Sequence, residues 1–400
     1  MSENSMLFAN NLTYTLPNPV SVATNRVMKK QYFQNRRYDQ EQTATCQWNT
    51  GVDLVDPKDS TLVFKFKVNS DDDFTVGFGT GSAANFLKNI RIYHRSGTTY
   101  TNTQNLNLFR KTSDRFNMSY NWFQSVGSLM RYDEVFTQDD GIVTCVIPLN
   151  HLHPFFEPLG DVLIPSVMAS GLRVEIDLAS LSEVFQANLG APTSYEITDI
   201  YFDTCSVSLM DSAQSSLNTN AQQNSLDYLY MDVFSSVNSH PSDTNAINID
   251  INKSVTFCQS AIACLQYQDD LNNLSNDSFK TSYLDAEWWY RLGSLQFPNQ
   301  KINDPRVAYH NSLLTFDKLK DVSKPSSVDF STFTSSNGIY SVCMERDSAL
   351  LLSQSPVNAS RALRFEASLE IPPTQSTLIT IFMTYVTSAR SSLLNSRVDI

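Results

Sequence analysis

The sequence predicts an all-β protein of two domains, each a sandwich of two β-sheets with short helices in its loops. Apolar and polar residues alternate in many short segments, and helical periodicity is sparse. A polar stretch near the middle divides the 400 residues into two parts of similar size. Each part is long enough for an eight-stranded sandwich.

The N-terminal residues 1–37 are expected to form a basic arm. The net charge of the whole chain is −12, yet no acidic residue occurs from Asn4 to Tyr38. The basic residues of this region are Arg26, Lys29, Lys30, Arg36 and Arg37. A block of like charge is either a solvated tail or an arm that contacts an anionic partner such as nucleic acid or lipid. The chain as a whole lacks the clustered positive charge needed to wrap nucleic acid.

The first domain is expected to span residues 38–210. Residues 62–68, 90–93 and 172–178 alternate between apolar and polar side chains, which predicts strands with one buried face. A helical stripe lies within residues 106–130, although one helix of that length is not favoured because Gly127 lies near its end. Short helical turns are expected at residues 83–88 and 180–186.

Residues 211–225 are expected to be the linker between the domains. This stretch has one charged residue, no aromatic residue and one large aliphatic residue, so it cannot build a core. The second domain, with a C-terminal tail, then covers residues 226–400. Residues 247–251 and 363–371 alternate, and residues 377–386 are apolar on both faces, as in a central strand. Residues 266–278 and 318–338 are expected to be long loops.

Cysteine spacing and hydropathy indicate a protein made without secretion. The six cysteines are Cys46, Cys145, Cys205, Cys258, Cys264 and Cys343, and none forms a C-x-x-C pair. The N-terminus has no signal-peptide pattern, and the longest apolar run, residues 377–387, is too short to cross a bilayer. We therefore expect free thiols in a reducing compartment.

The sequence contains no strong catalytic or cofactor-binding motif. The glycines of residues 77–81 lack phosphate-loop spacing, and both the G-x-S-x-G and H-E-x-x-H patterns are absent. We therefore expect no enzymatic activity and no cofactor.

Two groups of residues leave alternatives open. His151 and His153, with Glu157 nearby, could hold a metal, although a packed loop suits the neighbouring Pro154 better. The aromatic residues 288–290 could stack on a sugar or a base, or anchor a core or an interface. The rival functions are accordingly a metal-dependent enzyme and a carbohydrate- or receptor-binding sandwich of the lectin or fibre kind.

Three sequence segments resemble a known family when they are taken together. They are GSAANFLKNIRIYHRSG at 81–97, IPLNHLHPFF at 147–156 followed by LIPSVMASGLRVEIDL at 163–178, and WYRLGSLQFP at 289–298. In this order they resemble blocks of the major capsid proteins of Polinton-like viruses, adintoviruses and virophages. The match covers both halves of the chain, and the second block is the most specific.

This resemblance implies a double jelly roll, in which two eight-stranded jelly rolls stand side by side. Three copies would form a capsomer of pseudo-hexagonal outline that tiles the icosahedral shell of a DNA virus, so the chain would be located in the virion. The partners would be other copies of the chain, with penton and minor capsid proteins. The basic arm, with Arg26, Lys29, Lys30, Arg36 and Arg37, would face the interior and contact the genome or an internal membrane.

Overall fold

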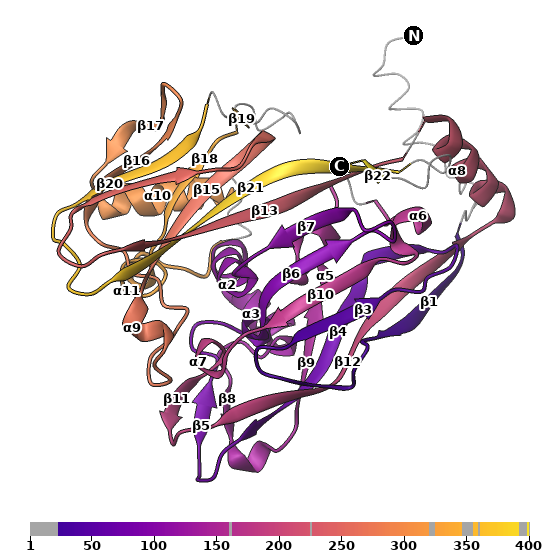
Figure 1. Cartoon of the computed structure of the whole chain (residues 1–400), viewed down its shortest axis with the longest axis horizontal. Coiled ribbons are helices and arrows are strands. Elements are labelled where there is room, and N and C mark those ends of the chain that lie inside the picture. The colour runs from indigo at the N-terminus through magenta and orange to yellow at the C-terminus, as the bar shows by residue number, and fades with distance from the viewer. Residues whose placement is uncertain are drawn as a thin grey trace, which may run out of the picture.

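The protein consists of two β-sandwiches that lie side by side (Figure 1). The computed structural model describes residues 23–159, 162–224, 226–319, 325–345, 355–358, 361–391 and 398–399. All pairings between the strands of its sheets are antiparallel, and the helices are short segments between strands. The prediction of an all-β chain with helices in its loops is confirmed.

The first sandwich is a jelly roll with two sheets of four main strands. In chain order the strands are β1 (Ala23–Tyr32), β3 (Thr43–Gln47), β4 (Leu54–Asn69), β6 (Leu87–Tyr93), β7 (Thr99–Thr103), β9 (Val143–Pro148), β10 (Arg173–Leu178) and β12 (Ser194–Leu209). The sheets run β1-β12-β4-β9 and β3-β10-β6-β7. When these strands are numbered one to eight, the orders are 1-8-3-6 and 2-7-4-5, as in two interlocked Greek keys.

The second sandwich repeats this topology. Its strands are β13 (Leu226–His240), β14 (Ala246–Ile251), β15 (Val255–Tyr267), β16 (Ala286–Leu292), β17 (Leu295–Ile302), β18 (Tyr340–Cys343), β20 (Leu363–Leu369) and β21 (Thr377–Ser391). The sheets run β13-β21-β15-β18 and β14-β20-β16-β17, which is again 1-8-3-6 and 2-7-4-5. Two eight-stranded jelly rolls are therefore confirmed.

Minor strands and helices complete the two halves. The additional strands are β2 (Arg37–Asp39), β5 (Thr75–Gly77), β8 (Val135–Thr137), β11 (Gln186–Leu189), β19 (Ser355–Val357) and β22 (Val398–Asp399). β11, β5 and β8 form a small separate sheet. The first half contains η1 (Ala83–Phe86), α2 (Leu106–Asn117), α3 (Tyr120–Gln124), α4 (Val126–Leu129), η2 (Gln138–Asp140), α5 (Leu149–Leu152), η3 (Pro154–Phe156), α6 (Ser166–Ala169) and α7 (Leu181–Val184). The second half contains α9 (Gln268–Leu271), α10 (Pro305–Thr315) and α11 (Phe330–Ser335).

The alternation of apolar and polar residues correctly predicted which strand side chains are buried in the cores. In β4 the side chains of Leu62, Phe64 and Phe66 are fully buried, whereas the residues between them are only half-buried. The run expected at residues 363–371 ends earlier than predicted, because β20 stops at Leu369 and Ile371 is 77% exposed. Two prolines follow Ile371, and a proline has no backbone N–H with which to continue the strand ladder.

The N-terminal boundary at residue 37 was wrong. Residues from Ala23 onward form β1, which pairs with β12 over ten residues of strand and belongs to the first jelly roll. The strand was not predicted because its charged side chains interrupt the alternation of apolar and polar residues. An edge strand tolerates such charge on its exposed face. Residues 1–22 of the expected arm lie outside the described residues.

The expected linker does connect the two jelly rolls, and it is helical. Helix α8 (Asp211–Asn224) lies between β12 and β13, at the upper right of Figure 1. Two of its hydroxyl side chains, Ser216 and Thr219, donate to backbone carbonyls four residues earlier. Residues 318–338, expected to be loop, likewise contain helix α11.

One hydrophobic core runs through both jelly rolls. Helix α2 supplies much of the contact, since its Phe109 packs against Phe382 and its Phe116 stacks on Phe316, with ring centroids 5.5 and 5.1 Å apart. At the other end of the contact, the Tyr230 hydroxyl donates to the Tyr100 carbonyl at 2.8 Å. The two jelly rolls are thus packed as one body through apolar contacts and hydrogen bonds from buried side chains.

Candidate functional site

Two of the three basic residues of β1, Arg26 and Lys29, are engaged by carboxylates in or next to strand β4. Arg26 pairs with Asp56 at 2.5 Å and also with Asp59, and these hydrogen bonds raise the pKa of Arg26. Lys29 Nζ lies 2.6 Å from an oxygen of Asp53. Much of the positive charge expected on a free arm is therefore neutralised within the first jelly roll.

The other three basic residues, Lys30, Arg36 and Arg37, are exposed. Arg37 pairs with Glu196 at 2.6 Å, and the Lys30 ammonium lies 4.4 Å from the centroid of the Tyr201 ring. Arg36 is exposed. Within the described residues, neither Lys30 nor Arg36 has a carboxylate oxygen within 4.0 Å. These two residues hold the unneutralised charge of the predicted basic group.

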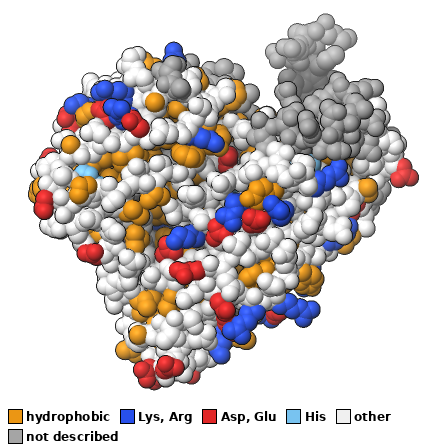
Figure 2. All heavy atoms as spheres, in the orientation of Figure 1, with side chains coloured by type: hydrophobic (Ala, Val, Ile, Leu, Met, Phe, Trp, Pro, Cys, Tyr) orange, Lys and Arg blue, Asp and Glu red, His pale blue; other side chains and the backbone are white. Residues whose placement is uncertain are grey.

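Charges of both signs alternate on the visible face of the first jelly roll (Figure 2). On the sheet containing β10 and β6, Arg91 binds Asp177 and Glu175 at 2.7 and 3.1 Å, and Lys88 binds Glu183 at 2.7 Å. A surface that binds nucleic acid requires clustered positive charge. This face instead carries both positive and negative side chains, as expected for a protein surface that must stay soluble or bind a neighbour of complementary charge.

The histidines proposed as metal ligands are buried hydrogen-bonding residues. His153 is fully buried, its Nδ1 accepts from the Phe155 N–H at 3.0 Å, and its Nε2 lies 2.9 Å from the Thr103 hydroxyl. Burial lowers the pKa of His153 to about 3, so the ring is neutral. Glu157 is exposed, and no three potential metal ligands cluster anywhere in the described part of the chain.

His151 belongs to a buried charged cluster with helix α2. Its Nδ1 lies 3.4 Å from Asp114 Oδ1, and Arg110 lies 2.6 Å from the same oxygen. The Tyr132 hydroxyl donates to the other Asp114 oxygen at 2.9 Å. Burial alone would raise the pKa of Asp114, but the charge of Arg110 and the hydrogen bonds hold that pKa below its usual value. This ion pair links α2 to α5.

The aromatic residues 288–290 do not form a binding platform. Trp288 and Tyr290 are fully buried in the second jelly roll, and the Tyr290 hydroxyl donates to the Tyr340 carbonyl at 2.8 Å. Only Trp289 reaches the surface, where Lys301 lies 4.1 Å from its ring centroid. The carbohydrate-binding hypothesis loses its proposed residues, and the core interpretation of Trp288 and Tyr290 is confirmed.

The glycine-rich segment 77–81 is a structural turn. Gly79 has a φ of +59°, and a side chain there would collide with Asp277 of the second jelly roll. The same carboxylate accepts a hydrogen bond from the Thr80 N–H at 3.0 Å. The glycines therefore allow close contact between the two halves, which is a role different from phosphate binding.

A large cavity was missed by the sequence analysis. It lies between the jelly rolls and is lined by Asp232 and Lys253, among others. Neither residue stands in a motif, because they come from different segments of the chain that the fold brings together. No helix in the described part of the chain combines the length and the apolar character that a bilayer crossing would require.

The comparisons with known proteins identify the fold. No protein-family model and no curated protein sequence matches the chain. Among solved structures, the Faustovirus major capsid protein superposes with a TM-score of 0.68 at 8% identity, covering 97% of this chain and 94% of that one. The quasi-atomic model of the PBCV-1 virus capsid gives 0.64 at 13% identity, covering 95% and 97%. The mavirus major capsid protein gives 0.53 at 9% identity, covering 98% and 94%. At such identities the similarity demonstrates a shared fold, the double jelly roll.

Proposed function

We propose that this chain is a major capsid protein, a structural subunit that assembles into capsomers and tiles an icosahedral viral shell. The observation that carries the proposal is the repeated strand order, 1-8-3-6 and 2-7-4-5, in two jelly rolls fused along one chain. This architecture matches capsid proteins along nearly the full length of both chains.

The residues themselves support a structural role over a catalytic one. The buried polar groups of Asp114 and His153 have hydrogen-bond partners within the protein, as buried polar groups of a stable fold usually do. Several large apolar side chains at edges and loops are strongly exposed in a single copy: Tyr32, Val52, Tyr120, Ile142, Leu189 and Ile371. Obligate assemblies bury such residues in interfaces of about 2,000–5,000 Å².

The proposed assembly unit is a trimer. Three side-by-side pairs of jelly rolls give six similar bodies around a threefold axis, which is the outline needed to pack hexagonally. Such a block cannot occupy a fivefold vertex, so a penton protein, with minor proteins between capsomers, would complete the shell. The three sequence blocks at 81–97, 147–178 and 289–298 favour the Polinton-like virus, adintovirus and virophage group among the possible relatives.

We also propose that the basic edge strand β1 and the segment that follows it, up to Arg37, face the shell interior. Support comes from Lys30 and Arg36, whose charges are not matched by carboxylates within the described residues. Replacing both residues by glutamate should leave trimers intact but lower the nucleic acid content of purified particles, measured as the ratio of absorbance at 260 and 280 nm. A Lys280→Glu change at another exposed lysine serves as control. Unchanged packaging in the double variant would remove this role.

The test of the function itself is expression of the chain alone. We expect particles of three times the 45.1 kDa chain mass by light scattering, and hexagonal blocks, arrays or shells by electron microscopy. A protein that stays monomeric at all concentrations, with no arrays or shells, would contradict the proposal.

A further inference from the structure

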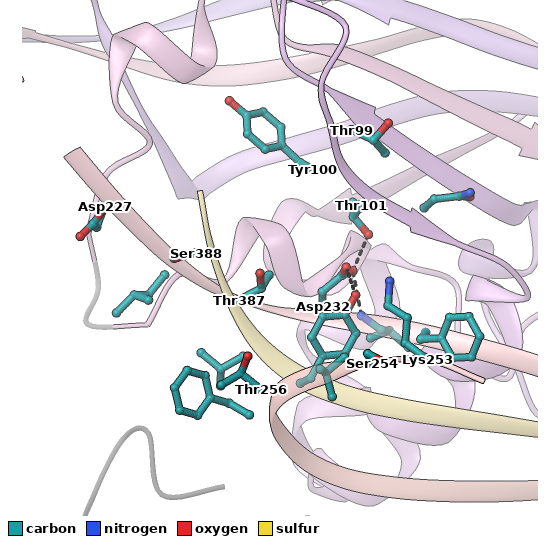
Figure 3. A pocket seen from close by; sticks show the side chains of 18 residues that line it. Thr99, Tyr100, Thr101, Asp227, Asp232, Lys253, Ser254, Thr256, Thr387 and Ser388 are labelled. Carbon is teal, nitrogen blue, oxygen red and sulfur yellow. Dashed lines mark hydrogen bonds between the residues drawn. The ribbon is translucent and has the colours of Figure 1, made fainter. Parts of the chain in front are cut away.

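A cleft of about 920 Å³ lies where the two jelly rolls meet (Figure 3). One wall is β7 of the first jelly roll, and the other is formed by β13, the start of β15 and the end of β21 of the second. The volume is within the range of about 300–1,000 Å³ that is typical of ligand-binding pockets. The lining mixes hydroxyl groups, aromatic rings, two carboxylates and one ammonium group.

The carboxylate of Asp232 is fully engaged within the protein. Thr101 donates to Oδ1 and Tyr385 to Oδ2, both at 2.5 Å, and the Val233 N–H donates to Oδ1 at 2.8 Å. Asp232 is buried, and the dashed lines in Figure 3 show the hydroxyl groups converging on it. Its oxygens therefore have little capacity left for a ligand.

The ammonium group of Lys253 is in the opposite situation. The side chain is half-buried, points into the cleft in Figure 3, and lies near the rings of Phe234 and Tyr385, at 5.8 and 5.7 Å from their centroids. Across the described residues, no carboxylate oxygen lies within 4.0 Å of its nitrogen and no acceptor is hydrogen-bonded to it. The charge of Lys253 acts on Asp232 from beyond hydrogen-bond distance, where it partly offsets the rise in the Asp232 pKa. An ammonium group has three donors, so Lys253 presents hydrogen-bond donors without an acceptor inside the cleft.

The surroundings of Lys253 favour a peptide over a polyanion. Exposed hydroxyl groups of Thr99, Ser254 and Thr256 line the cleft, and β7 has a neighbouring strand on one side only. A strand with a single neighbour and nearby side-chain pockets is the usual setting for binding an extended chain. Asp227 and Asp232 line the same cleft, which disfavours a nucleic acid or another group carrying several phosphates.

We propose that this cleft binds an extended peptide segment and that Lys253 anchors a carboxylate side chain of that peptide. The hydroxyl groups of Ser254 and Thr256 would add hydrogen bonds to the same carboxylate or to the peptide backbone. The site lies within one copy of the chain. The proposal therefore goes beyond assembly of the shell and is tested separately from it.

The experiment uses the soluble full-length chain and a bead-displayed library of randomised heptapeptides. Enriched peptides should contain an aspartate or glutamate at a recurring position. The best peptide and its amide counterpart, with Asn or Gln at that position, are then measured by fluorescence anisotropy. Because a charge-assisted hydrogen bond inside a cleft is strong, the amide peptide and the Lys253→Gln variant should each bind about tenfold or more weakly.

Further variants separate charge from folding and from shape. Lys253→Arg should keep most of the affinity, and Lys280→Gln, at an exposed lysine outside the cleft, should keep all of it. Thr256→Trp should block binding by filling the cleft, even though the charge remains. Enrichment of no peptide, equal binding by Lys253→Gln, or complete competition by millimolar inorganic phosphate would each overturn the proposal.

Discussion

Two buried aspartates, one in each jelly roll, show how the same side chain is stabilised in different ways. Asp114 of α2 lies 2.6 Å from Arg110 and close to His151, so its negative charge is paired. Asp232 of β13 has only neutral donors in direct contact, the hydroxyls of Thr101 and Tyr385 and a backbone N–H. The first cluster is an ion pair within one half, and the second is a hydrogen-bond network that joins the two halves.

The pKa values of the two carboxyls consequently move in opposite directions. Burial raises the pKa of both, but at Asp114 the Arg110 charge and the hydrogen bonds from His151 and Tyr132 outweigh burial and lower the pKa. At Asp232 burial dominates and the pKa is raised, although the hydrogen bonds from Thr101 and Tyr385 oppose the change. Burial therefore sets the direction of the pKa shift at Asp232, whereas a charged partner and hydrogen bonds override it at Asp114.

The largest effect is expected from breaking the ion pair. Asp114→Ala leaves the Arg110 guanidinium buried without its counter-ion, and such a loss costs about 3–5 kcal/mol. We expect a marked fall in melting temperature, measured by calorimetry, and reduced yield of folded protein. A loss of less than about 1 kcal/mol would show that the pair is not a major stabilising contact.

A smaller effect is expected at the contact between the jelly rolls. Asp232→Ala removes the acceptor of three donors, and leaving buried donors unpaired costs about 1–3 kcal/mol. The loss should be measured by the same calorimetric method. If Asp232→Ala lowers the free energy of unfolding more than Asp114→Ala does, the proposed difference between a paired charge and a network of neutral donors is wrong.

The pH dependence of stability should differ in sign between the two sites. A carboxyl with a lowered pKa stabilises the fold at pH values above its unfolded pKa, and this contribution is lost as the pH falls through the folded pKa. The advantage of the wild-type chain over Asp114→Asn should therefore shrink below about pH 3.9, the usual value for aspartate.

The opposite holds for Asp232, whose contribution is fully present at low pH and is lost as the pH rises through its raised pKa. The advantage of the wild-type chain over Asp232→Asn should shrink as the pH rises above about 4. Melting temperatures of the wild-type chain and both variants, measured below and above about pH 4, test the two signs. Parallel profiles would contradict the account of the two carboxyls.

The smallest effect is expected at an exposed ion pair, which sets the baseline for the comparison. Lys301 and Glu287 are 3.1 Å apart, and both side chains are more than 40% exposed. Glu287→Gln should change stability by less than about 1 kcal/mol, because solvent screens such pairs. A larger loss would mean that surface charges matter more in this chain than its buried clusters suggest.

The sequence predicted the parts of the fold that depend on local periodicity. Residues 62–68, 172–178 and 247–251 alternate clearly, and they form strands β4, β10 and β14. Strand β1 was not predicted because an edge strand can be stabilised by pairing with one partner, here β12, and can carry charged side chains. Helix α8 was not predicted because serine and asparagine have weak helix propensity.

Side-chain clusters were harder to predict than strands. Thr101, Asp232 and Tyr385 are far apart in sequence and meet only after both jelly rolls have folded. Similarly, nothing local distinguishes Lys253 from any other lysine of the chain. A sequence pattern gives the face on which a residue lies, but the partner across the contact follows from the topology of the whole chain.

The most direct test of the central claim is electron cryo-microscopy of the particles formed by the purified chain. The account predicts a threefold particle with six jelly rolls in a pseudo-hexagonal ring, formed by three copies of the two-lobed body in Figure 1. A monomeric particle, or an oligomer whose jelly rolls do not surround a threefold axis, would contradict it.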